Sequence, residues 1–91
     1  MKITVRVFGD LKNAFGAREL IRSVECGMRV SDVLKVLGTE YDSLASKPGW
    51  ESQLQRARIL LNGMDMHSSL GMDCQLNEGD VITILPAIAG G

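Results

Sequence analysis

The chain has 91 residues, of which 45% are hydrophobic and 23% are charged, and its formal net charge at pH 7 is −1. This length fits one domain, and a charge near zero gives no reason to expect long-range attraction to nucleic acid or to anionic lipid. Because only two phenylalanines, one tyrosine and one tryptophan are present, the composition also argues against a surface on which nucleic-acid bases stack.

The sequence shows no sign of export or of insertion into a membrane. Residues 1–10 (MKITVRVFGD) alternate polar and apolar side chains and lack the unbroken apolar core of a signal peptide. No segment approaches the run of about 20 apolar residues that crosses a bilayer. We therefore expect a cytoplasmic protein in which Cys26 and Cys74 are thiols, although a disulfide between them is conceivable and any role for them stays open. Together with His67 these cysteines lack the paired spacing of a structural zinc site, so no metal is predicted.

The first quarter of the chain is predicted to form two strands. Residues 2–8 alternate between two sides, as in a half-buried strand. One side holds Ile3, Val5 and Val7, and the other holds Lys2, Thr4, Arg6 and Phe8. Residues 9–16 are rich in turn formers and are expected to connect the strands. Residues 18–25 favour a second strand, but the adjacent Leu20 and Ile21 leave its register open.

A helix is predicted from Ser31, a good N-cap, with Asp32 placing a favourable charge in its first turn. One apolar stripe runs along it, formed by Val33, Leu34, Leu37, Tyr41 and Leu44. Gly38 is expected to weaken the middle of the helix, and a break or an end of the helix at this residue stays open. Residues 46–55 contain Pro48-Gly49 and are expected to be a loop with at most a short helical turn, in which Trp50 covers the edge of the core.

Two more strands are predicted in the second half of the chain, at residues 58–61 and 81–85. Asn62-Gly63 is a strong signal for a tight turn. The strand at 81–85 is so apolar that we expect it in the centre of the sheet, parallel to residues 2–8. These elements predict an α+β fold, with a mixed sheet of four to five strands packed on one main helix, in the ubiquitin-like β-grasp arrangement.

Three segments carry a more specific signal: KITVRVFGDLKNAFG at the start, ILLNGMDM in the middle and LNEGDVITILPAIAGG at the end. They resemble the MoaD/ThiS family of ubiquitin-like sulfur carriers, most closely the small subunit of molybdopterin synthase. The end segment carries the family's tail pattern, with matches at Gly79, Asp80, Pro86, Ala89, Gly90 and Gly91. Ala87-Ile88 stands where many members have Pro-Val, which is a conservative change in bulk. The resemblance covers essentially the whole chain and is weakest over residues 46–55.

The resemblance implies a domain at residues 1–86 and a flexible tail at residues 87–91. It also implies that a partner resembling ubiquitin-activating enzymes adenylates the carboxylate of Gly91 with ATP. Sulfur from a donor such as a cysteine desulfurase or a rhodanese then converts this carboxylate to a thiocarboxylate. The tail enters the large subunit of molybdopterin synthase and donates the sulfur to a pterin precursor. The protein would thus be a sulfur-donor subunit without a bound cofactor, and not a catalyst by itself.

The physical chemistry of the tail fits this role. Glycines without a Cβ make Gly90-Gly91 slim enough to thread a narrow channel. Pro86 cannot continue a strand ladder, so we expect the tail to leave the sheet there. Ile88 and Ala89 are expected, with Pro86, to contact the partner.

A partner-binding surface is predicted on the sheet face that carries no helix. By alternation, Phe8 and Leu85 face away from the predicted core, and so does Leu60. If their strands adjoin, the three side chains form one apolar patch, and such a patch on a small protein marks a partner site. The resemblance implies the same, because the family docks both the activating enzyme and the synthase on this face.

Other functions on the same fold stay open. Ubiquitin-like archaeal modifiers share the fold and the tail but join the terminal glycine to lysines of target proteins. Other relatives supply sulfur for thiamine, for tRNA thiolation or for cysteine. A pure interaction module with an inert tail is the third class. The sequence does not separate these functions, because the choice depends on the partners.

Overall fold

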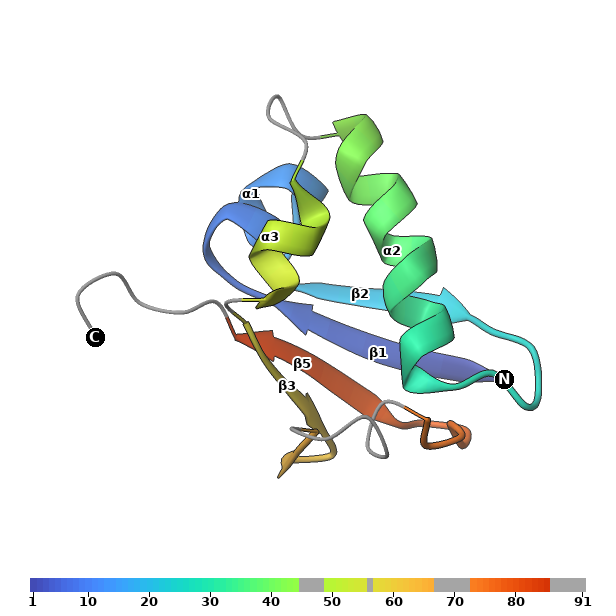
Figure 1. Cartoon of the computed structure of the whole chain (residues 1–91). Coiled ribbons are helices and arrows are strands. Elements are labelled where there is room, and N and C mark those ends of the chain that lie inside the picture. The colour runs from blue at the N-terminus through green and yellow to red at the C-terminus, as the bar shows by residue number, and fades with distance from the viewer. Residues whose placement is uncertain (45–48, 56, 67–72, 86–91) are drawn as a thin grey trace.

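The structure is a computed structural model that describes residues 1–44, 49–55, 57–66 and 73–85. Figure 1 shows a sheet with the longest helix lying across one face. The elements follow the chain in this order: β1 (Lys2–Val7), α1 (Gly9–Phe15), β2 (Glu19–Ser23), α2 (Val30–Leu44), α3 (Trp50–Gln55), β3 (Arg58–Leu61), β4 (Met64–Asp65) and β5 (Val81–Leu85).

The sheet has the predicted topology. Its strands lie in the order β2-β1-β5-β3-β4, so that β5 is central. It pairs in parallel with β1 and antiparallel with β3. Ile82 and Ile84 of β5 are fully buried, because one neighbouring strand lies on each side and helices cover their face. The α+β fold with a mixed five-stranded sheet is confirmed.

The main helix, α2, packs through four residues of the predicted stripe, Val33, Leu34, Leu37 and Tyr41, which are all buried. The prediction is wrong for Leu44, which is the last residue of the helix and is 57% exposed. The start of α2 also differs from the prediction. The helix begins at Val30, and the Asp32 carboxylate accepts a hydrogen bond from the backbone N–H of Arg29 at 3.0 Å, so Ser31 lies inside the first turn and is not the N-cap. The Asp32 side chain therefore caps the helix by accepting the N–H of Arg29, the residue that precedes the first residue of α2.

Gly38 does not break α2, which settles the alternative that the sequence left open. The helix continues to Leu44, and Gly38 is buried against the indole of Trp50. A Cβ at this position would lie 2.5 Å from Trp50 Cδ1, which is closer than packed carbon atoms approach. Gly38 is thus needed for the close approach of α3 to α2, and the packing compensates for its low helix propensity.

Two short helices stand where connections were predicted. Residues 9–15 form α1, which buries Leu11 and ends at Gly16 with φ 75°, the left-handed conformation typical of a helix C-terminus. The expected loop contains α3, whose Trp50 is 6% exposed and packs on Tyr41 with ring centroids 5.6 Å apart. The prediction that Trp50 covers the edge of the core is confirmed. Both helices are too short for periodicity to reveal them.

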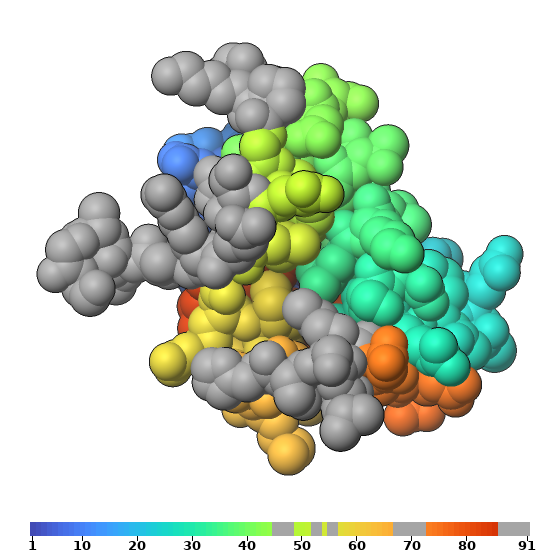
Figure 2. Space-filling view, in the orientation of Figure 1, coloured from blue at the N-terminus to red at the C-terminus, as the bar shows by residue number. Residues whose placement is uncertain are grey.

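The helices and the sheet enclose a single core. Figure 2 shows α2 and α3 next to each other on one face of the molecule. None of the helices in the described ranges is long and apolar enough to pass through a membrane.

Candidate partner-binding site

The sheet face opposite α2, here called the open face, carries the patch predicted from alternation. Val7 lies beside Ile84 in the parallel pairing of β1 and β5, so the next residues along, Phe8 and Leu85, are neighbours. Phe8 keeps an extended backbone, with φ −140° and ψ 165°, so the alternation of β1 continues through it. Leu60 lies opposite Thr83, one row further along the same face. Phe8, Leu60 and Leu85 are all half-buried. The structure therefore brings the three predicted residues to one face.

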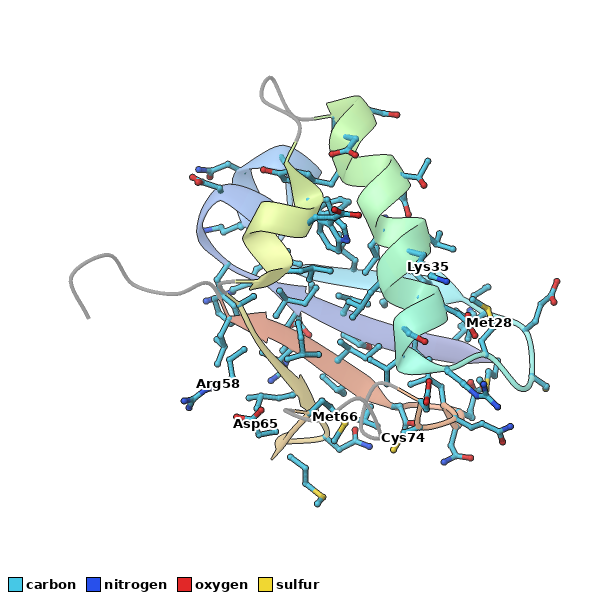
Figure 3. All side chains as sticks on the ribbon, in the orientation of Figure 1. Met28, Lys35, Arg58, Asp65, Met66 and Cys74 are labelled. Atoms are coloured by element: carbon cyan, nitrogen blue, oxygen red, sulfur yellow. The ribbon has the colours of Figure 1, made fainter. Side chains whose placement is uncertain are left out.

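Two ion pairs flank this patch. Arg6 Nε lies 3.5 Å from Glu19 Oε2 on the β2 side, and Arg58 Nε lies 3.3 Å from Asp65 Oδ2 on the β4 side. Figure 3 labels Arg58 and Asp65, which approach each other beyond the β3 edge. The arginine side chains are 51% and 64% exposed, so each pair contributes little to folding stability. Both guanidinium groups therefore remain accessible to a carboxylate of a partner.

A further apolar side chain extends the open face beyond the predicted patch. Ile21 lies opposite Thr4 and is 67% exposed. The sequence did not reveal it, because the register of the second strand was undetermined. The arginines were missed for a different reason: Arg6 and Arg58 have the same alternation parity as Phe8 and Leu85, and this signal was present but not used.

The predicted tail begins at the patch. Leu85 is the last residue of β5 and a member of the patch. Pro86, Ile88, Ala89, Gly90 and Gly91 lie outside the described residues, as does the predicted boundary between residues 86 and 87. A partner that covers the patch would thus contact the chain where the last six residues start.

The remaining side chains with reactive or ligating atoms do not gather at the open face. Cys26 and Cys74 are both exposed. Cys26 lies in the segment between β2 and α2, and Cys74 lies in the segment that precedes β5. Across the described ranges, no three histidine, cysteine or acidic side chains are grouped as they would be around a metal ion. His67 lies outside the described residues. The open face is therefore described by its apolar patch and the two ion pairs that flank it.

Comparison with known proteins identifies relatives along the whole chain. Small archaeal modifier protein 3 of Haloferax volcanii is 29% identical over 92 residues, and sulfur carrier protein CysO of Mycobacterium tuberculosis is 28% identical over 95 residues. Both alignments cover 100% of this chain and 100% of the relative.

Solved structures agree with this relationship. Small archaeal modifier protein 1 from Methanosarcina acetivorans superposes with a TM-score of 0.71 at 32% identity, over 99% of this chain and 96% of that chain. A chain of the complex between subunits 1 and 2 of molybdopterin-converting factor from Helicobacter pylori superposes with a TM-score of 0.64 at 24% identity, over 100% of both chains. This second likeness is one of fold. A family model described as the ThiS family matches residues 5–91. The chain therefore has the ubiquitin-like β-grasp fold and belongs to the ThiS family, whose members include sulfur carriers and small archaeal modifiers.

Proposed function

We propose that this protein carries sulfur on the carboxylate of Gly91. The observation that carries the proposal is the position of Leu85, which belongs both to the apolar patch and to the strand from which the Gly-Gly segment continues. A partner docked on the open face is therefore placed at the start of this segment. The five residues after Pro86, if extended, reach about 17 Å into the partner.

The chemistry divides between the chain and its partners. A carboxylate is a poor electrophile, so an activating enzyme first joins the Gly91 carboxylate to AMP, using ATP and releasing pyrophosphate. The persulfide of a donor such as a cysteine desulfurase or a rhodanese then attacks the acyl carbon and displaces AMP, and a thiol reductant cleaves the resulting acyl disulfide to leave the thiocarboxylate. This chain supplies the acceptor carboxylate and the docking surface, while the catalytic groups belong to the partners. It binds no cofactor of its own in this scheme.

The acceptor that we propose is the pterin precursor of molybdopterin. The tail segments quoted above resemble the small subunit of molybdopterin synthase, and the fold is shared with the molybdopterin-converting factor complex. The protein would then be the sulfur-donor subunit of a two-protein enzyme, with the large subunit bound on the open face.

Protein modification is the second candidate. It is favoured by the end-to-end similarity to small archaeal modifier protein 3. The similarity to CysO likewise supports sulfur transfer toward cysteine. All these functions share the activation of Gly91. They differ in whether a lysine amine takes the acyl group or an electrophilic acceptor is attacked by the thiocarboxylate sulfur.

The test is the intact mass of the protein after incubation with an activating enzyme, ATP and a sulfur donor. Replacement of one oxygen by sulfur, absent from a chain that lacks Gly91, is expected for a carrier. Addition of the synthase large subunit and the pterin precursor should then remove the sulfur and form molybdopterin. Conjugates to lysines in place of the sulfur-loaded form would establish the modifier function. A chain that is never adenylated would overturn both.

A further inference from the structure

The outer edge of β2 offers backbone hydrogen-bonding groups. In the antiparallel pair of β1 and β2, Val7 N–H donates to the Arg18 carbonyl, and Val24 N–H donates to the Met1 carbonyl. Because the hydrogen-bonded rows alternate, the N–H and C=O groups of Glu19, Ile21 and Ser23 point away from β1. The described residues provide these groups with one weak contact, from Arg22 Nη1 to the Ile21 carbonyl at 3.4 Å. Strand β2 is therefore an edge open to another strand.

A groove of about 610 Å³ runs beside this edge, between β2, the loop that follows it and α2. Its floor is apolar and includes Val24, Met28, Val33, Val36 and Leu37. Val36 is 52% exposed, although it lies on the side of α2 that faces the groove. Figure 3 labels Met28, in the loop before α2, and Lys35, in the N-terminal half of α2.

The two sides of β2 determine the side chains that an added strand would present. Leu20, Arg22 and Val24 point toward α2, as the ion pair of Arg22 with Glu40 at 2.9 Å shows. Ile21 points to the open face and is 67% exposed. Alternate residues of an added strand would thus enter the groove and cover Ile21, so apolar side chains are favoured on both of its sides.

The charges of the groove favour a cationic end on such a strand. Its charged residues are Arg22, Glu25, Asp32, Lys35 and Glu40. The charges of Arg22 and Glu40 cancel in their ion pair. The two carboxylates of Glu25 and Asp32 then outnumber the single ammonium group of Lys35, so the groove has a negative net charge. Asp32 also accepts the backbone N–H of Arg29, so its position beside the groove is fixed. In an added strand antiparallel to β2, a lysine or arginine that precedes the apolar run would lie beside the end of β2, near Glu25.

We propose that β2 and this groove bind an extended segment of a partner protein, which adds to the sheet as a sixth strand. The segment has a short run of apolar residues with a basic residue at the end near Glu25. Main-chain hydrogen bonds to Glu19, Ile21 and Ser23 hold it, and the groove selects its side chains. This site lies on the opposite side of the sheet from the β3–β4 edge and does not involve the Gly-Gly segment, so it is independent of sulfur loading.

The probe is a peptide, Lys-Val-Ile-Val-Ile-Ser, blocked at both ends and titrated into the full chain labelled with ¹⁵N and ¹³C. The expected result is saturable movement of the amide signals of Glu19, Ile21 and Ser23 in the NMR spectrum. The methyl signals of Val36 and Met28 should move with them. The same peptide, N-methylated at the alternate residues whose N–H groups would face β2, should not bind, because it lacks the hydrogen-bond donors to the β2 carbonyls.

Two variants of α2 separate the groove from the rest of the helix surface. Val36→Lys should raise the dissociation constant of the peptide by about tenfold or more. The matched control is Leu44→Lys, because Leu44 is 57% exposed on the same helix and does not line the groove. Both variants should load sulfur normally, which distinguishes a failure here from a failure of the proposed function.

The proposal is overturned by any of three results. These are equal weakening by Val36→Lys and Leu44→Lys, signal changes confined to Phe8 and Leu85, and no saturable change at β2. The last check is the mass of the protein alone, measured by analytical ultracentrifugation. A monomer is expected, and a dimer paired through β2 would contradict the proposal, because a second copy would then occupy the edge in place of the partner segment.

Discussion

The two faces of the sheet use alternate residues of the same strands for different purposes. On the face under α2, Val5, Val7 and Ile84 are fully buried and hold the fold together. On the open face, Phe8, Leu60 and Leu85 are only half-buried, although they are equally apolar. A water-exposed apolar side chain adds little to folding, so the open face retains free energy that a partner can gain by covering it. Alternate residues of the same strand thus serve folding stability on one face and partner recognition on the other.

The largest effect is expected at the Gly-Gly end, because Gly91 carries the proposed acceptor carboxylate. Deleting Gly91 should abolish sulfur loading, because the activated carboxyl must reach one position in the partner's site, and a displacement of about 1 Å costs roughly 100-fold in rate. Gly90→Val should act similarly by widening the tail. Mass spectrometry of the thiocarboxylate, formed with a cognate activating enzyme, measures the sulfur loading of each variant. Thermal unfolding is the control, and the stability of the variants should be unchanged. Normal loading of the truncated chain would end the sulfur-carrier interpretation.

A charge on the open face should break recognition and leave the fold intact. Leu85→Lys is expected to weaken binding to the activating enzyme or the synthase subunit by more than about 100-fold, since an unpaired charge in an apolar contact costs several kcal/mol. Phe8→Lys should do the same. Titration calorimetry measures the affinity, and Leu44→Lys on α2 is the control that adds the same charge elsewhere. Equal affinities for all three variants would assign docking to another surface.

The covered face should respond in the opposite way. Ile82→Ala removes fully buried methyl and methylene groups beside β1 and β3, and should lower the free energy of unfolding by about 2–5 kcal/mol. Thr83→Ala, one residue along β5 on the open face, should cost less than about 1 kcal/mol. Urea denaturation of the pair compares the two faces directly. Similar losses for both variants would contradict the division between them.

Gly38→Ala tests packing against intrinsic propensity. Propensity alone predicts a gain of about 1 kcal/mol, because alanine favours a helix more than glycine does. The new Cβ would meet Trp50 at 2.5 Å, so we expect a net loss of about 1–3 kcal/mol in the free energy of unfolding. Thr39→Ala is the control, being the adjacent and exposed position of α2. A stabilised Gly38→Ala protein would show that α3 moves away at little cost.

The smallest effect is expected at the flanking ion pairs. Arg58→Ala should change the free energy of unfolding by less than about 1 kcal/mol, because the pair with Asp65 is exposed. Its effect on partner association should fall as the salt concentration rises. Association rates measured at two ionic strengths test this. A salt-independent loss of affinity would place Arg58 in the buried centre of the interface.

The sequence by itself determined the features that repeat with a fixed local period or motif. Alternation assigned Phe8, Leu60 and Leu85 to one face, because neighbouring side chains of a strand must point to opposite sides. The stripe of α2 was found for the same kind of reason. The apolar composition of residues 81–85 placed that strand in the centre, since only a strand with two neighbours buries both edges.

Only the tertiary structure decided the features that depend on contacts distant in sequence. The role of Gly38 follows from its distance to Trp50, and the exposure of Ile21 follows from its pairing with Thr4. Helix α1 forms because Leu11 finds a place in the core, although seven residues carry no readable period. In each case the deciding free energy comes from a neighbour that the local sequence does not specify, and packing therefore overrides propensity.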